Sequence, residues 1–428
     1  MRCTIMENAR NKNTRNNEVY YIMKRYRLRP LATSRILAGE RLVRLDDFEQ
    51  TDQVETLAEG MVIALTDAKR QLNAKALVGR QKKGLAWVFT LDMSEYWDEE
   101  FITYTFEEAL EKRKDLLAEY QTATTAFRIF NGEGDGIGGL TADYYDGFVQ
   151  FNWYSEGIYE YREWFVEALL SLMPSIKGVY ETKRFKVSKD EAAISHTKGE
   201  LAPQPLIVKE NDIQYAVYLG EDWMTGIFLD QREVRNFVQT QAQGLSVLNL
   251  FSYTGAFSVA AAVGGAKRTV SIDVANRSID KTKEQFALNG IEGEPPHHEI
   301  RVMDVFDYIH YAKRHELQFD MIVCDPPSFA RTKKRTFSAE KDYAKLAQDL
   351  FDITAPNGLC ILSTNHSGYK KEAFIKEMSK VGRSHSGHFQ LIQSFGLPSD
   401  FPTSQDSESQ YLKVLIFYRN YLNQNYHS

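Results

Sequence analysis

From about residue 206 onwards, strand-like and helix-like segments alternate in regular order. Amphipathic or alanine-rich helical segments separate the first five expected strands, whereas little helix is expected between the last two. The strands are SVLNLF, TVSID, HEIRVMD, FDMIVCD, GLCILST, FQLIQSF and YLKVLIFY. This order predicts an α/β fold with a doubly wound parallel sheet and a terminal antiparallel strand. Such a sheet binds its ligand at the carboxyl ends of the strands.

The first 205 residues lack this alternation and divide into three zones. Residues 1–23 are asparagine-rich and aperiodic, which predicts a disordered extension. Residues 24–99 begin with many cations and continue with short β-like runs, so we expect a small β-barrel with one basic face. An ordinary solvated surface explains this charge equally well. Residues 100–205 predict a central α+β domain with helices over 104–120 and 157–173, and residues 206–428 form the sheet domain.

Charge and cysteine content limit the partners of the chain. Cys3, Cys324 and Cys360 are its three cysteines, and they form no CxxC pair, which argues against a disulfide framework or a bound metal. No apolar run approaches the ~20 residues of a membrane helix, and no secretory signal opens the sequence. We therefore expect a cytoplasmic protein. Because the net charge is −6, nucleic acid must be bound by local patches. Monomer and homodimer both remain open.

One glycine-rich stretch imitates a nucleotide-binding motif. Residues 134–139 match GxGxxG letter for letter. A dinucleotide loop, however, follows a strand and opens a helix, whose N-terminus receives the phosphates. Here the alternating segment GFVQFNWY follows, so we expect these glycines to shape hairpins.

Polar groups follow four successive strands of the predicted sheet. The loop after the first strand contains Gly255, which lets a ligand approach the backbone at the start of a helix. An acid after the second strand can bind ribose hydroxyls, and one after the third can bind an adenine amino group. Tight turns and helix N-caps are the structural alternatives. The predicted adenosine site comprises Phe251, Tyr253, Thr254, Gly255, Asp273, Asp304, Val305 and Asp325.

The fourth strand runs into the sequence DPPSFARTKKR. Pro326 and Pro327 fix the backbone after Asp325 and remove two N–H donors. Phe329 is suited to stacking on a base. The cations Arg331, Lys333, Lys334 and Arg335 are suited to flanking phosphates. The alternative is a strand-to-helix turn followed by a solvated basic loop.

The motifs FSYTGAF, SID, VMDVF and DPPSF, preceded by TGIFLDQREVR, resemble those of S-adenosylmethionine-dependent methyltransferases of large-subunit ribosomal RNA. The resemblance extends from about Lys24 to the C-terminus. It implies an N-terminal RNA-binding PUA domain, a central α+β domain and a Rossmann-like class I methyltransferase domain. It also implies that Phe228, Gln231 and Arg232 cover the methionine end of the cofactor S-adenosylmethionine.

One departure from this family concerns the atom that is methylated. Cytosine-5 methylation requires a thiolate that adds to the ring, and the cytosine-5 members carry that cysteine just after the fifth strand. This sequence has LSTNHSG over residues 362–368, with His366 near the expected position of the thiol. We expect Cys360 to pack in the core and Cys324 to point away from Asp325.

The stretch instead resembles the related guanine-N7 methyltransferase domains, and Asn365 with Asp325 could position a base edge. Purely structural roles explain these residues equally well: Asn365 would bond the loop backbone, and His366 would lie on the surface. A methyltransferase with a nitrogen target is therefore favoured. A cytosine-5 enzyme and an inactive, cofactor-dependent RNA-binding assembly factor are the alternatives. A nicotinamide oxidoreductase is poorly supported, because GxGxxG lies outside the strand–helix region.

Overall fold

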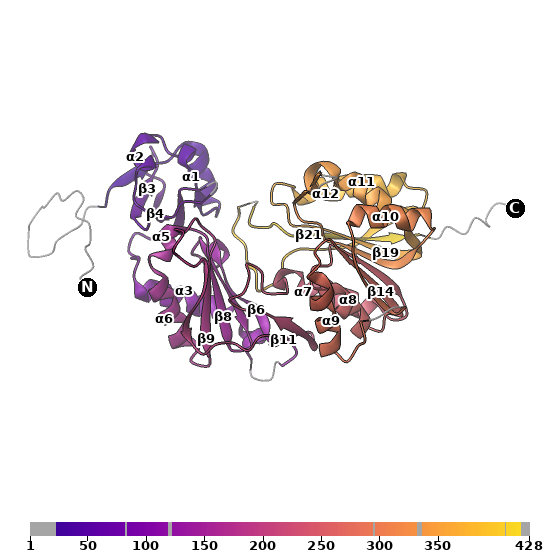
Figure 1. Cartoon of the computed structure of the whole chain (residues 1–428). Coiled ribbons are helices and arrows are strands. Elements are labelled where there is room, and N and C mark those ends of the chain that lie inside the picture. Colours follow the sequence, from indigo (N-terminus) through magenta and orange to yellow (C-terminus); the bar gives the residue numbers. More distant parts are fainter. Residues whose placement is uncertain are drawn as a thin grey trace, which may run out of the picture.

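The structure is a computed structural model that describes residues 23–81, 84–118, 122–293, 296–331, 336–406 and 408–420. Of the predicted extension, only Met23 is described, and Lys333, Lys334 and Arg335 also lie outside these residues. Figure 1 shows the N-terminal elements stacked on a central sheet, with the C-terminal sheet and its helices beside them. The predicted domain boundaries stay predictions.

The N-terminal part is a five-stranded sheet in the order β1-β3-β4-β5-β2. Its core includes Leu28, Ile36 and Phe48. Arg35 forms ion pairs with Glu40 and Asp47, so part of the expected basic face is neutralised. The elements are β1 Arg25–Arg27, α1 Pro30–Leu37, β2 Leu42–Val43, η1 Leu45–Asp47, α2 Asp52–Glu55, β3 Val62–Thr66, β4 Asn73–Val78 and β5 Ala86–Thr90.

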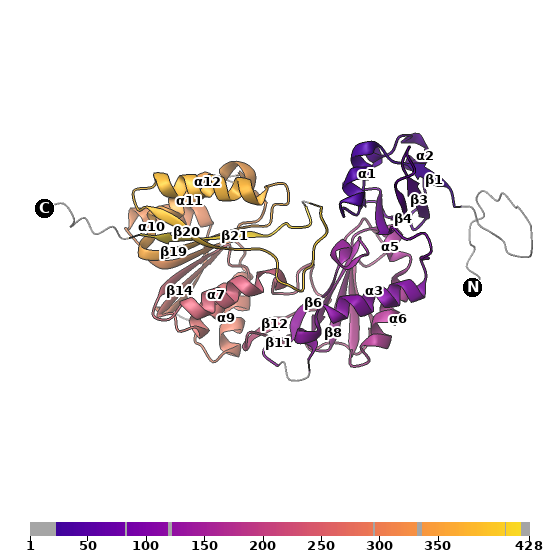
Figure 2. The same ribbon diagram turned by 180° about the vertical axis from the view of Figure 1, so that it is seen from behind.

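The central sheet has the order β10-β9-β8-β7-β6, and α3 and α6 pack on one of its faces (Figure 2). Residues 134–139 lie in the connection between the antiparallel strands β6 and β7, which confirms the hairpin prediction. The elements are α3 Glu99–Glu111, α4 Lys114–Leu117, β6 Ala126–Asn131, η2 Gly132–Asp135, β7 Leu140–Tyr145, β8 Phe148–Trp153, α5 Glu156–Tyr159, α6 Arg162–Leu172, β9 Gly178–Lys183 and β10 Ile194–Gly199.

The helix predicted over residues 104–120 begins earlier, at Glu99, and ends at Glu111, before the short helix α4. The Asp98 carboxylate accepts a hydrogen bond of 2.9 Å from the backbone N–H of Phe101. This N-cap satisfies one of the free donors of the first turn and therefore sets the start of the helix.

Strands β11 Leu206–Glu210 and β12 Ile213–Val217 form a hairpin that precedes the C-terminal sheet. The helices η3 Leu229–Gln231 and α7 Arg232–Gln241 connect this hairpin to the sheet. The sheet order is β15-β14-β13-β16-β19-β21-β20. The elements are β13 Ser246–Leu250, α8 Ala256–Val263, β14 Arg268–Asp273, α9 Ser278–Leu288, β15 His298–Val302, α10 Val305–Arg314, β16 Phe319–Cys324, β17 Phe329–Arg331, β18 Thr336–Ser338, α11 Ala339–Asp352, β19 Thr354–Thr364, α12 Lys371–Ser384, β20 Phe389–Phe395 and β21 Lys413–Arg419.

The predicted fold class is confirmed. Strands β13 to β16 and β19 pair in parallel, and β21 is antiparallel to both of its neighbours. Helices α10, α11 and α12 cover one face, and α7 and α8 cover the other. Both faces are thus buried, which explains the nearly continuous apolar strands. Helix α12, between β19 and β20, was not predicted. In the described part of the chain, no helix is both long and apolar enough to cross a membrane.

Candidate active site

The loop between β13 and α8 has an unusual backbone. Phe251, Tyr253 and Gly255 all adopt positive φ angles, of 58°, 52° and 79°. A Cβ atom on Gly255 would lie 2.3 Å from Cγ2 of Thr282, so only glycine fits. The Thr254 hydroxyl donates a 2.7 Å hydrogen bond to the Gly226 carbonyl. Two strained aromatic residues in one loop mark it as a candidate ligand loop.

Asp273, at the end of β14, holds this loop. One of its carboxylate oxygens accepts a 2.9 Å hydrogen bond from the Tyr253 backbone, and the other accepts one of 2.9 Å from the Ala275 backbone. Asp273, Tyr253 and Thr254 border a cavity of about 290 Å³. Asp273, the residue predicted to bind the ribose hydroxyls, therefore lies at the rim of a cavity.

Asp304 caps helix α10. Its carboxylate accepts backbone hydrogen bonds of 3.0 Å from Phe306 and 3.3 Å from Asp307. Val305 is buried in the core. The structural alternative foreseen for Asp304 is therefore present, and its contact with adenine stays a prediction.

Asp325 and Gln231 meet at the end of β16. The Gln231 amide donates hydrogen bonds of 3.0 Å to the Asp325 carboxylate and 2.9 Å to the Ser363 hydroxyl. Burial raises the pKa of Asp325 to about 6, and the negative charge of Asp230 acts in the same direction. The Gln231 Oε1 atom is buried and has no hydrogen-bond partner within the described residues. The structure thus brings Gln231 together with the acid of the DPPSF turn.

The DPPSF turn also meets the loop after β19. The Ser328 hydroxyl donates a 2.7 Å hydrogen bond to the side-chain oxygen of Asn365. Asn365 therefore bonds a side chain of the turn rather than its own loop backbone. Pro326 is buried and Pro327 is exposed. The Phe329 side chain is 62% exposed, so its ring is accessible.

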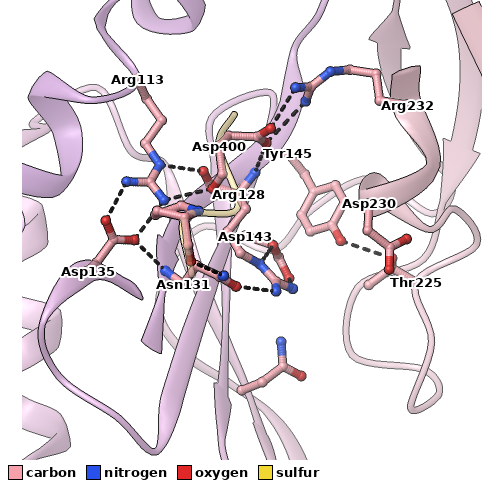
Figure 3. A network of polar contacts seen from close by, with 12 residues as sticks. Arg113, Arg128, Asn131, Asp135, Asp143, Tyr145, Thr225, Asp230, Arg232 and Asp400 are labelled. Carbon is pink, nitrogen blue, oxygen red and sulfur yellow. Dashed lines mark hydrogen bonds and ion pairs between the residues drawn. The ribbon is translucent and has the colours of Figure 1, made fainter. Parts of the chain in front are cut away.

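The residues predicted to cover the cofactor lie in two different surroundings. The Phe228 ring lies 5.4 Å from the Tyr253 ring and so borders the ligand loop. The Arg232 guanidinium instead forms two buried hydrogen bonds with Asp400, of 2.6 Å and 3.1 Å (Figure 3). Its predicted contact with the cofactor has no support in this geometry. Asp400 comes from the β20–β21 connection, and no sequence motif indicated it.

Both described cysteines are unsuited to nucleophilic attack. Cys324 and Cys360 are fully buried in the core, as predicted for Cys360, and burial raises the pKa of both thiols. His366, near the expected position of a thiol, is partly buried. Its carbonyl accepts a 2.7 Å hydrogen bond from Lys413.

These residues fit an adenosylated sulfonium ligand. Gly255 adopts a positive φ of 79° directly before α8, and the free backbone N–H groups of the first turn of this helix suit an anionic group of a ligand. The free Oε1 of Gln231 is a buried acceptor that suits an ammonium donor. Leaving such an acceptor without a partner costs about 1–3 kcal/mol.

Comparison with known proteins identifies the family. A family model described as S-adenosylmethionine-dependent methyltransferase matches residues 128–418, and one described as a PUA-like domain matches residues 27–91. YwbD of Bacillus subtilis (strain 168), provisionally named a ribosomal RNA large subunit methyltransferase, is 45% identical over 362 residues, which are 83% of this chain and 90% of that protein. Ribosomal RNA large subunit methyltransferase I of Aeromonas salmonicida (strain A449) is 31% identical over 77% of this chain and 83% of its own.

A solved structure supports the same assignment. The crystal structure of SMU.776, described as a candidate methyltransferase complexed with SAH, superposes with a TM-score of 0.84 and 37% sequence identity. The superposition covers 92% of this chain and 100% of that one. Together with the strand-end geometry, these matches show that the chain belongs to the S-adenosylmethionine-dependent methyltransferases with an N-terminal PUA-like domain, and that S-adenosylmethionine is its cofactor.

Proposed function

We propose that the enzyme methylates a base of large-subunit ribosomal RNA, at a ring nitrogen of the guanine-N7 type. The names of its relatives support ribosomal RNA as the substrate. The choice of nitrogen rests on the inaccessible thiols of Cys324 and Cys360, whose pKa values are raised by burial. The stretch after β19, where cytosine-5 enzymes of the family carry their nucleophile, contains no cysteine. A cytosine ring carbon would therefore lack the covalent activation that it needs.

A nitrogen target requires less of the protein. The bound cofactor supplies an electrophilic methyl group that leaves its sulfur as the new N–CH₃ bond forms. Guanine N7 has an exposed lone pair and loses no proton, so alignment and electrostatics suffice. The protein must hold the base edge and keep water from competing.

The ends of β16 and β19 supply groups for this alignment. These strands are adjacent and parallel, so Asp325 and Asn365 lie at the same edge of the sheet. The Asn365 amide carries N–H donors that suit the O6 acceptor beside guanine N7. Pro326 and Pro327 lack N–H donors and present only carbonyls, while Phe329 offers an exposed ring for stacking. Arg331, Lys333, Lys334 and Arg335 are assigned to the flanking phosphates.

Mass mapping of ribosomal RNA nucleosides from parent and deletion strains tests this proposal. We expect one 7-methylguanosine of the large subunit to disappear in the deletion strain and to return with the native gene. A gene encoding Asp325→Ala serves as the negative control. Loss of 5-methylcytidine alone would overturn the nitrogen assignment.

A further inference from the structure

A cleft of about 440 Å³ lies between the central sheet and the segment before α7. One wall is formed by β6, β7 and β8, and the other by residues 223–225 and 227–230 together with Phe401 and Tyr411 of the β20–β21 connection. This volume lies within the range of roughly 300–1,000 Å³ that is typical of small-molecule sites. The cleft is therefore large enough for a planar heterocycle.

The sheet wall of the cleft is polar although it is buried. Successive residues of a strand point to opposite faces, and in β8 the residues Val149, Phe151 and Trp153 belong to the apolar core beneath the helices. The alternate residues Gln150 and Asn152 line the cleft and are only 2% and 6% exposed. Burying amide groups is unfavourable unless they gain hydrogen bonds. A polar face in this position points to a polar ligand.

Some polar side chains of this face form hydrogen bonds within the protein, and not every polar atom has a partner among the described residues. Asp143 accepts hydrogen bonds of 2.8 Å and 3.1 Å from Arg128, which also donates one of 2.8 Å to Asn131 (Figure 3). The Gln150 amide nitrogen donates to Thr182 at 2.9 Å. Its Oε1, by contrast, is buried without a partner among the residues described. An unused amide acceptor suits the amino group on a base edge.

Exposed rings gather at the same cleft. Tyr154, Trp223 and Phe228 line it and are 38%, 43% and 44% exposed. The Arg184 guanidinium lies 5.1 Å from the centre of the Trp223 ring and donates a 3.3 Å hydrogen bond to Asn152. Aromatic rings beside an arginine form a stacking platform for nucleobases.

The cleft adjoins the candidate active site without including it. Phe228, Leu229 and Asp230 line the cleft, and the next residue, Gln231, bonds Asp325. Asp325, Asn365 and Phe329 are not part of the lining. An occupant of the cleft would therefore lie beside the base at the DPPSF turn rather than at its position.

We propose that this cleft binds a nucleobase of the RNA substrate next to the one that is methylated. This base is turned out of its stack, with its edge against Gln150 and Asn152 and its ring against Trp223 or Phe228. The cost of unstacking is offset by stacking on protein rings. The inference rests on RNA as the proposed substrate and adds a second base-binding site to it.

Two variants of the full-length protein test the cleft. Gln150→Leu removes the unused acceptor, and Trp223→Ala removes an exposed ring. Tyr104→Ala is the matched control, because this side chain is 55% exposed and does not line the cleft. The measurements are RNA affinity in the presence of S-adenosylhomocysteine and methyl transfer to ribosomal RNA from a strain that lacks the enzyme. Binding of S-adenosylhomocysteine and the melting temperature report intact folding.

Each cleft variant should raise the Kd and KM for RNA about tenfold, the effect of losing one base contact, and leave the rate at saturating RNA unchanged. Tyr104→Ala should change neither. Unchanged RNA affinity in both cleft variants would overturn the proposal. A lower rate at saturating RNA with unchanged KM would also overturn it, because the reacting base would then occupy the cleft.

The same experiment separates this proposal from the proposed function. Methylation of cytosine carbon-5 would overturn the nitrogen assignment, whereas the RNA affinities of the variants would still decide the role of the cleft. Absence of RNA binding by the native chain would overturn both proposals.

Discussion

Arg232 and Asp400 form a buried ion pair between residues that are 168 positions apart in the sequence. The same Asp400 carboxylate accepts a 2.9 Å hydrogen bond from the backbone N–H of Arg128. The backbone carbonyl of Asp400 accepts one of 2.7 Å from the Arg113 guanidinium. Arg113 in turn pairs with Asp135 (Figure 3). One residue of the β20–β21 connection thus joins the central sheet to the first helix of the methyltransferase sheet.

Replacing Asp400 should therefore loosen the join between the two sheets. Asp400→Ala leaves the buried Arg232 guanidinium with only a 3.4 Å contact to the half-exposed Glu233, and breaking a buried ion pair costs up to about 3–5 kcal/mol. The expected result is a lower urea midpoint of unfolding, measured by circular dichroism. Glu111→Ala breaks the exposed pair with Lys114 and should leave the midpoint unchanged. Equal midpoints for both variants would contradict the assignment.

The pH dependence of methyl transfer should follow Asp325. Burial raises its pKa to about 6, so the carboxylate form, which can accept hydrogen bonds from N–H donors of the substrate base, is present above this pH and is lost below it. The rate at saturating substrate should fall about tenfold per pH unit below about 6. Gln231→Leu removes a hydrogen bond that stabilises the carboxylate, so the descending limb should move to higher pH. A pH profile identical to that of the native enzyme would exclude this role of Gln231.

Local patterns in the sequence predict the methyltransferase sheet well. Its strands are buried on both faces and therefore appear in the sequence as short apolar runs. Polar residues follow the first four of these strands. Asp273 and Asp325 could therefore be proposed as candidate site residues before their contacts were known. The early start of α3 could also have been found, since Asp98 is a typical N-cap residue.

Contacts between distant segments could not be predicted in this way. Arg232 lies in a motif that resembles a cofactor cover, yet its guanidinium is bound by Asp400, which lies in a loop without periodicity. The polar face of β8 is visible as alternation in FVQFNW, but the sequence does not show that a cavity rather than solvent faces Gln150. Such relationships depend on how the two sheets pack.

Asn365 should affect the chemical step more than cofactor binding. Asn365→Ala removes the amide proposed to hold the base edge, and misalignment of a reacting group costs about 10²-fold in rate. The affinity for S-adenosylhomocysteine, measured by calorimetry, should not change. Ser328→Ala removes only the hydroxyl that bonds Asn365, so a smaller loss is expected. An unchanged rate for Asn365→Ala would exclude its positioning role.

Methyl transfer should survive removal of the buried thiols. Cys324→Ala and Cys360→Ala leave small cavities and lower stability, since both side chains are fully buried. The rate of transfer from labelled S-adenosylmethionine to ribosomal RNA should remain, because a nitrogen target needs no thiolate. The assay is run below the melting temperature of each variant. Loss of transfer in a folded variant that still binds S-adenosylhomocysteine would favour a covalent cytosine mechanism.

Alanine substitutions at Gly255 and Gly244 should distinguish the effect of backbone strain from that of a side-chain collision. Gly255 and Gly244 have similar φ angles of 79° and 73°, so an alanine at either position meets the same backbone penalty of about 1–2 kcal/mol. Only at Gly255 does the added Cβ collide, at 2.3 Å from Cγ2 of Thr282, whereas nothing lies within 4 Å at Gly244. Gly255→Ala should therefore abolish S-adenosylhomocysteine binding in calorimetry, and Gly244→Ala should preserve it. Thr282→Ala, combined with Gly255→Ala, removes the colliding atom and should restore part of the affinity if the loop holds the cofactor. Equal affinities for the two single variants would show that the loop after β13 is not the cofactor site.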